Sequence, residues 1–129
     1  MADFRYELLK GVPFVTAKVL GRHLGFSGRF IIDTGSYMTI VRTPRLDAMG
    51  YSAREDAIGP FKTSSVIGEE EGYCLRVKAF EVFGKKFEGF EIAALDLPPK
   101  YRIEGLIGMN LLNLFDWCVH PSKQVISVR

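Results

Sequence analysis

The sequence predicts an all-β domain that is closed or folded back on itself and carries one or two short helices. Runs rich in Val, Ile, Phe and Thr recur along the chain, and polar connections with Gly or Pro separate them. Only two segments have the signals of a helix. The 129 residues suffice for one hydrophobic core and are too few for two, so we expect a single domain over residues 1–129.

The expected strands mostly follow one another in pairs. Residues 73–83 and 86–95 form the longest pair, and Gly84 between them predicts a β-hairpin. Another pair flanks the turn residues Pro121, Ser122 and Lys123. All the predicted strands are enriched in β-branched and aromatic residues, and they cover residues 14–20, 28–33, 39–41, 73–83, 86–95, 117–120 and 124–128.

Each of the two expected helices follows a recognisable signal. Thr43 is a capping type of residue, Pro44 suits the first helical position, and Gly50 lies just past the expected end. The second helix is expected within residues 109–115, directly after Gly108. Helix is therefore scarce, and the predicted fold class remains all-β.

The charges are balanced along the chain, with 17 Lys and Arg residues against 15 Asp and Glu and a net charge of +2. This balance argues against nucleic acid or an anionic membrane as a partner. The first ten residues carry charges where a secretory signal needs an apolar segment, and no run approaches the ~20 apolar residues of a membrane span. We therefore expect a cytoplasmic protein, although a domain excised from a longer precursor would look the same.

The cysteines and histidines do not form a recognisable motif. Cys74 and Cys118 are too few for a disulfide framework and lack CxxC spacing, so we expect free thiols that are buried or partly buried. His23 and His120 stand apart in the sequence. We therefore expect no metal site and no organic cofactor.

The segment that carries chemistry is Asp33, Thr34, Gly35 and Ser36, which follows an apolar run. A carboxylate at the end of an apolar strand is costly unless it is hydrogen-bonded or shares a proton. Gly35 lets the backbone turn sharply and approach a ligand closely. The hydroxyls of Thr34 and Ser36 can orient the carboxylate or brace the loop. Two such loops facing each other would supply a pair of carboxylates.

The alternative interpretation of this segment is an ordinary surface turn, in which Asp-x-Gly is common. The apolar residues before Asp33 and the Thr-Ile-Val segment 39–41 after it argue against that alternative, because a surface turn rarely lies between two buried strands. A second pattern, Leu106-Ile107-Gly108, precedes the second expected helix. Alone it would indicate only a strand that stops at a glycine.

With residues 33–36 and 106–108 in this order, the chain resembles the retropepsin-like aspartic proteases, which comprise the retroviral proteases and their cellular relatives. In that family an apolar strand ending in Asp-Ser/Thr-Gly is followed by an apolar-apolar-Gly stretch that packs behind the catalytic loop. The Gly-x-Asn-Leu-Leu that starts at Gly108 also looks like the retroviral version. The resemblance covers residues 14–128 and implies a closed β-barrel that is half of an acid protease.

The resemblance implies a homodimeric aspartic endopeptidase, in which Asp33 of each protomer activates one water against a peptide bond. Thr34 would tie the two loops together, and Gly35 and Ser36 would line the cleft. Because the sequence holds one Asp-Thr-Gly, a second copy of the chain must supply the partner carboxylate. Residues 124–128 are a candidate interface, since a sheet edge there would otherwise be open.

A retropepsin fold also needs a flap, a hairpin that covers the substrate. Residues 63–73 have the expected position, with Ile67 and Gly68 near the tip, and their backbone would hydrogen-bond to an extended peptide. An exposed loop with a solvated acidic run is the alternative. If the acidic residues 69–71 face the cleft, they would favour basic peptides.

Several residues depart from the retroviral pattern. Tyr37 and Met38 stand where retroviral members carry acidic residues, and Met109 replaces an arginine that braces the retroviral dimer. Residues 44–61 also form a longer segment than in those enzymes. These departures support a second hypothesis, a catalytically silent module that binds peptides or dimerises. The complete Asp33, Thr34 and Gly35 set favours the enzyme.

Overall fold

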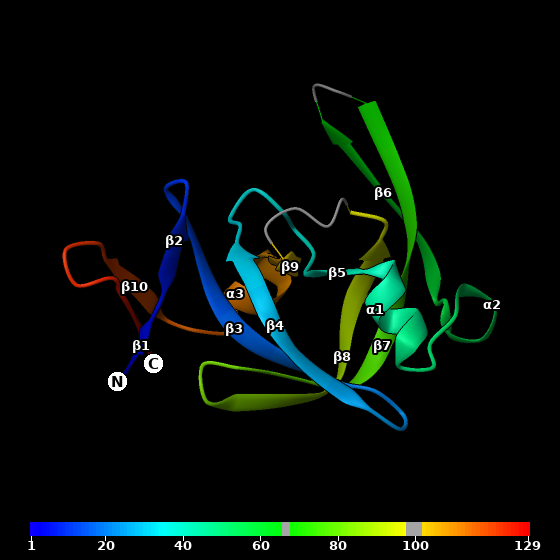
Figure 1. Cartoon of the computed structure of the whole chain (residues 1–129), viewed down its shortest axis with the longest axis horizontal. Helices are drawn as coiled ribbons and strands as arrows, with labels where there is room; N and C mark the ends of the chain where they lie inside the picture. The colour runs from blue at the N-terminus through cyan, green and yellow to red at the C-terminus, as the bar shows by residue number, and fades with distance from the viewer. Residues whose placement is uncertain (66–67, 98–101) are drawn as a thin grey trace.

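The computed structural model describes residues 1–65, 68–97 and 102–129, and β-strands dominate these ranges (Figure 1). The elements in chain order are β1 (Ala2–Arg5), β2 (Glu7–Leu9), β3 (Val12–Leu20), β4 (Gly25–Ile32), β5 (Ile40–Arg42), α1 (Thr43–Ala48), α2 (Ala53–Asp56), β6 (Gly59–Ser65), β7 (Gly68–Val82), β8 (Lys85–Leu95), β9 (Ile103–Ile107), α3 (Met109–Leu112), β10 (Trp117–His120) and β11 (Val125–Val128).

Six strands close into a ring, in the order β3-β4-β9-β5-β8-β7. The ring closes because β3 pairs with β4 along most of its length and with β7 at residues 18–20. Strand β2 extends the sheet beyond β3, and β6 extends it beyond β7. The prediction of a closed, all-β fold is therefore confirmed.

The interior of the ring is filled by side chains that alternate along the strands. Val15, Ala17 and Val19 of β3 are buried while the residues between them are exposed, which is the period-2 pattern of a strand with one face toward the core. Phe30 and Phe80 are fully buried and meet edge to face, with ring centroids 5.5 Å apart. Burial of each such side chain contributes about 2 kcal/mol to folding.

The hairpin predicted at Gly84 is present. Phe83 and Gly84 connect β7 to β8 and both have positive φ angles, of 53° and 70°. Two successive positive φ angles define the tight turn whose twist matches that of paired strands, and glycine adopts this conformation without a steric penalty. The turn fixes the register of the longest strand pair in the described chain.

The helices are short, as expected, but their details differ from the prediction. Pro44 lies in the first turn of α1 and Gly50 follows its end with a φ of 90°, whereas the N-cap is Arg42 and not Thr43. Helix α3 ends at Leu112, earlier than predicted. Helix α2 was not predicted. No helix in the described ranges is long and apolar enough to cross a membrane.

The two ends of the chain form a separate three-stranded sheet in the order β1-β11-β10 (Figure 1). The side chains of Asp3, Ser127 and His120 link its strands, since the Ser127 hydroxyl donates to Asp3 at 2.6 Å and lies 3.0 Å from His120 Nε2. Strand β11 pairs on both sides. The expectation of an open edge at residues 124–128 is therefore wrong, because β1 and β10 occupy both edges.

Candidate active site

The loop of residues 33–39 crosses the end of β9. Strand β9 lies between β4 and β5, so the connection from β4 to β5 has to pass over Gly108. A Cβ atom at residue 108 would lie 2.2 Å from the Met38 carbonyl oxygen and 2.7 Å from that of Ser36. Only glycine leaves room for this crossing, and the backbone N–H of Met109 then donates to the Ser36 carbonyl at 2.8 Å.

Asp33 lies directly after β4, at the start of this crossing, and is partly buried in the single chain. Its backbone N–H donates to the Ile107 carbonyl at 3.0 Å, so the parallel pairing of β4 with β9 continues to the carboxylate. The side chain accepts a hydrogen bond from the Gly35 N–H, with 2.9 Å between N and Oδ1. The other carboxylate oxygen has no protein donor among the described residues.

The other predicted site residues surround Asp33 in different ways. Thr34 and Gly35 are exposed at the crest of the loop. The Ser36 hydroxyl donates to the Met38 carbonyl at 2.7 Å, so it braces the loop and does not contact the Asp33 carboxylate. Within the described residues the Thr34 hydroxyl makes no hydrogen bond.

Thr39 and Asn110 hold the loop from beneath. Thr39 is fully buried, and its hydroxyl accepts from the Gly108 N–H at 3.2 Å while donating to Asn110 Oδ1 at 2.8 Å. Asn110 also accepts from the Thr39 N–H and donates to the Glu91 carbonyl at 2.9 Å. Sequence reasoning assigned no role to Thr39. A polar residue within an apolar strand segment was the available signal, because a buried hydroxyl needs partners.

A hollow of about 210 Å³ adjoins the loop and includes Asp33, Gly35 and Ser36 in its wall. Its other wall is mostly apolar, from Ile40, Phe61, Leu95, Leu97 and Leu106. Tyr37 also lines the hollow and packs on Phe61, with ring centroids 5.7 Å apart. The next residue, Met38, is buried. The carboxylate thus faces a space that suits an apolar side chain; we call this space the cleft.

The hairpin of β6 and β7 projects from the ring (Figure 1). Thr63 of β6 and Glu70 of β7 line the cleft. Of the residues expected at the flap tip, Gly68 is the first residue of β7 and pairs with Ser65, whereas Ile67 lies outside the described residues. Within the acidic run of residues 69–71, Glu70 lines the cleft, whereas a Glu71 carboxylate oxygen lies 3.5 Å from Lys62 Nζ.

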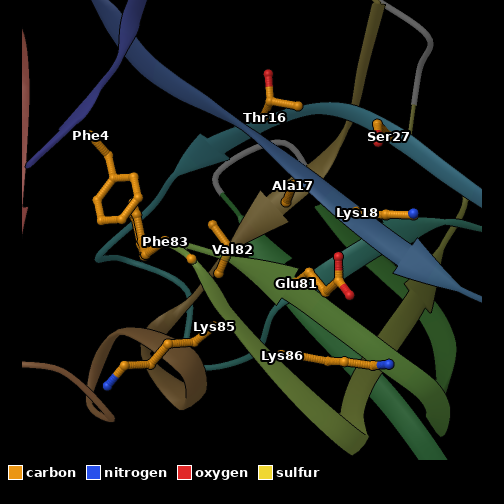
Figure 2. Close-up of a pocket in the computed structure, with 11 residues that line it drawn as sticks. Phe4, Thr16, Ala17, Lys18, Ser27, Glu81, Val82, Phe83, Lys85 and Lys86 are labelled. Carbon is orange, nitrogen blue, oxygen red and sulfur yellow. The ribbon is translucent and has the colours of Figure 1, made fainter. Parts of the chain in front are cut away.

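The two cysteines and another hollow do not belong to this candidate site. Cys74 is partly buried, as expected, and burial raises the pKa of its thiol, with a further rise from Glu91. Cys118 is exposed, so the expectation of a buried or partly buried thiol is wrong at that position. No group of three or more His, Cys, Asp or Glu side chains in the described part of the chain could hold a metal ion. This hollow, of about 530 Å³, lies between β3 and the β7–β8 turn and is lined by Lys18 and Lys86 but by no residue of the loop (Figure 2).

Comparisons with known proteins agree with this geometry. The crystal structure of a retropepsin-like aspartic protease from Rickettsia conorii superposes with a TM-score of 0.68 at 16% identity, covering 98% of this chain and 89% of that one. EIAV protease complexed with the inhibitor HBY-793 superposes with a TM-score of 0.59, also at 16% identity, covering 81% and 88%. At this identity the two structures show the shared fold, which confirms the prediction of a retropepsin-like fold. A search of curated proteins finds no match.

The family model for aspartyl proteases matches residues 15–111. This range contains the Asp33 loop, both strands of the β6–β7 hairpin and the Gly108 crossing. The chain therefore belongs to the aspartyl protease family.

Proposed function

We propose that the protein is an aspartic endopeptidase that acts as a homodimer, with Asp33 of each protomer at one shared site. The observation that carries this proposal is the position of Asp33, on a braced loop at the wall of a cleft in a member of the aspartyl protease family. Thr34, Gly35 and Ser36 form the support of that site, and Ile67 and Gly68 belong to the flap.

The chemistry requires two carboxylates. Hydrolysis of an amide needs a base that takes a proton from water and an acid that protonates the leaving nitrogen. Two carboxylates that hold one proton between them supply both functions. One chain contributes one such carboxylate to the cleft, since the sequence has a single Asp-Thr-Gly. The exposed Thr34 at the loop crest is the side chain best placed to meet the partner's loop.

The lining of the cleft indicates which peptides it accepts. The apolar wall suits an apolar side chain next to the scissile bond, and burial of that side chain supplies binding energy. Glu70 at the rim favours a basic side chain nearby. Charge reversal, Glu70→Lys, tested against a peptide library, should shift the preference away from Lys and Arg.

The decisive experiment is Asp33→Asn, which keeps the shape of the side chain and removes the ionisable group. Peptide cleavage should fall by at least about 10²-fold, the scale of a general acid–base contribution. Asp116→Asn is the matched control, because Asp116 is exposed and 3.6 Å from Arg129, away from the cleft. Cleavage by Asp33→Asn at the parental rate would show that Asp33 is not catalytic.

Two further measurements, on the parent and on Asp33→Asn, separate the enzyme from a silent binding module. Sedimentation should show a dimer for both the parent and Asp33→Asn, and the parent's activity should have a bell-shaped, acidic pH profile, since only the singly protonated pair is competent. A parent that binds peptides but never cleaves them would support the module instead. A fully active monomer would rule out the shared site.

A further inference from the structure

A third hollow, of about 520 Å³, is lined by arginines and is separate from both the cleft and the hollow in Figure 2. Its charged side chains are Arg29 of β4, Arg42 of β5, Arg45 of α1, and Arg102 and Glu104 at the start of β9. We call these five residues the arginine pocket. Four cations around one carboxylate leave a local excess of three positive charges, which exceeds the net charge of the whole chain. Such an excess attracts an anionic ligand.

One carboxylate is already bound in the arginine pocket. Glu104 is 6% exposed, its Oε2 lies 2.8 Å from Arg45 Nε and 3.7 Å from Arg42, and its stem packs on Gly28, where a Cβ would lie 2.5 Å from its Cγ. The hydrogen bond from Arg45 and the charge of Glu104 raise the pKa of the Arg45 guanidinium. The pocket thus has the donor geometry that a carboxylate requires.

Two of the arginines have no carboxylate partner in the described chain and are therefore candidates to bind an anionic ligand. Neither Arg29 nor Arg102 forms an ion pair within the described residues. The Arg29 guanidinium lies 5.0 Å from the centre of the Phe14 ring, a contact that orients it and leaves its N–H edges available. A guanidinium group can donate two parallel hydrogen bonds to one carboxylate, so Arg29 and Arg102 could together hold a pair of carboxylates.

The arginine pocket and the cleft lie on the same face of the same two strands. On β9, Leu106 lines the cleft and Glu104 lines the arginine pocket; on β5, Ile40 and Arg42 have the same relation. Ile40 pairs directly with Leu106. Because side chains two residues apart share a face of a strand, the two sites are roughly 7 Å apart along the sheet. Arg42 Nε also donates to the carbonyl of Leu97, a cleft residue.

We propose that the arginine pocket binds acidic side chains of the polypeptide substrate, two or three residues beyond the segment held in the cleft. This inference rests on the proposed function and adds a charge preference to it. An extended peptide advances about 3.3 Å per residue, so a chain leaving the cleft along β5 and β9 reaches the arginine pocket within that distance. The substrate class is therefore a peptide with an apolar centre and a nearby pair of Asp or Glu residues.

The test measures binding in the Asp33→Asn background, so that it does not depend on catalysis. A set of labelled peptides shares an apolar centre and carries a glutamate pair at successive positions, and a twin set carries glutamine. At one or two positions the glutamate peptide should bind on the order of tenfold more tightly, the scale of a charged hydrogen bond. Arg29→Gln with Arg102→Gln should remove this preference, and high salt should weaken it.

The matched control is Lys18→Gln with Lys86→Gln, which removes the same charge from the hollow in Figure 2 and should keep the preference. Equal loss in both double variants, or retention in both, would overturn the inference. Binding of inorganic phosphate or a single-stranded oligonucleotide with the same arginine dependence, and no glutamate preference, would also overturn it. A glutamate preference in a protein whose parent cleaves nothing would instead contradict only the proposed peptidase.

Discussion

The two ends of β9 lie between the same neighbours, β4 and β5, but different interactions hold them. At the Gly108 end the contacts are uncharged and buried or partly buried: the Thr39 hydroxyl, the Asn110 amide and backbone groups. At the other end, Glu104 pairs with Arg42 and Arg45, whose side chains are 15% and 48% exposed. One strand thus combines a rigid support for Asp33 with a charged pocket whose arginines are partly exposed.

The largest expected effect is at the uncharged end. Gly108→Ala places a methyl group 2.2 Å from the Met38 carbonyl, and the crossing backbone has no flexible side chain that can yield. We expect a loss of roughly 3 kcal/mol in the free energy of unfolding. Denaturant unfolding measures it, and Gly59→Ala is the control, because a Cβ there meets nothing within 4 Å. A loss no larger than that of the control would show that the crossing is not tightly packed.

The next effect concerns the hydroxyl that supports the crossing. Thr39→Val keeps the shape of the side chain but leaves the Gly108 N–H without its acceptor in a buried site. We expect a loss of roughly 2 kcal/mol that does not depend on salt, together with lower peptidase activity. Thr16→Val on the exposed face of β3 is the matched control and should be close to neutral. A strong salt dependence would contradict the uncharged nature of this end.

At the charged end the expected effect is smaller and depends on salt. Glu104→Gln removes the carboxylate that neutralises Arg42 and Arg45, but solvent screens the more exposed Arg45. We expect a loss of roughly 1 kcal/mol at low ionic strength and less at high salt. Thermal unfolding at several salt concentrations gives the answer. A loss equal to that of Gly108→Ala would mean that both ends are structural supports and would remove the contrast.

The local structure around the candidate site could be predicted from the sequence because its requirements lie within short segments. An apolar strand before Asp33, a glycine two residues later and Gly108 after two apolar residues are visible in short windows. The hairpin at Gly84 was visible for the same reason. Helix α2 was missed although Ser52 and Glu55 have capping spacing, and Ser52 Oγ does accept from the Glu55 N–H at 3.2 Å.

What the sequence did not reveal depends on which strands are neighbours. The arginine pocket assembles residues from three separate segments, 29, 42–45 and 102–104, and no spacing rule links them. The edges of β11 were assigned wrongly because β1, the strand that covers one of them, is mostly exposed and lacks an apolar alternation. Ring closure by β3 and β7 likewise joins residues about sixty positions apart. Patterns within one segment carry no information on such contacts.

The smallest effect comes from a buried polar atom that forms neither a hydrogen bond nor an ion pair in the described part of the chain. The Tyr73 hydroxyl is buried without a hydrogen-bond partner among the described residues. Burial raises its pKa above the ordinary value of 10.0, and Asp47 and Asp56 raise it further. Tyr73→Phe removes the unpaired group, so we expect stability at neutral pH within about 1 kcal/mol of the parent, in the stabilising direction.

The pH dependence of this variant gives the sign of the effect. Because the pKa is raised in the folded protein, the unfolded tyrosine ionises first as the pH increases past 10, and the parent loses stability through that range up to the folded pKa. Tyr73→Phe should lose less stability there, as measured by unfolding across the alkaline range. If the variant is instead clearly destabilised at neutral pH, the Tyr73 hydroxyl has a hydrogen-bond partner in the folded protein. The free-energy cost of a buried polar group without a partner would then have to be measured at the Gly108 N–H, in the Thr39→Val variant.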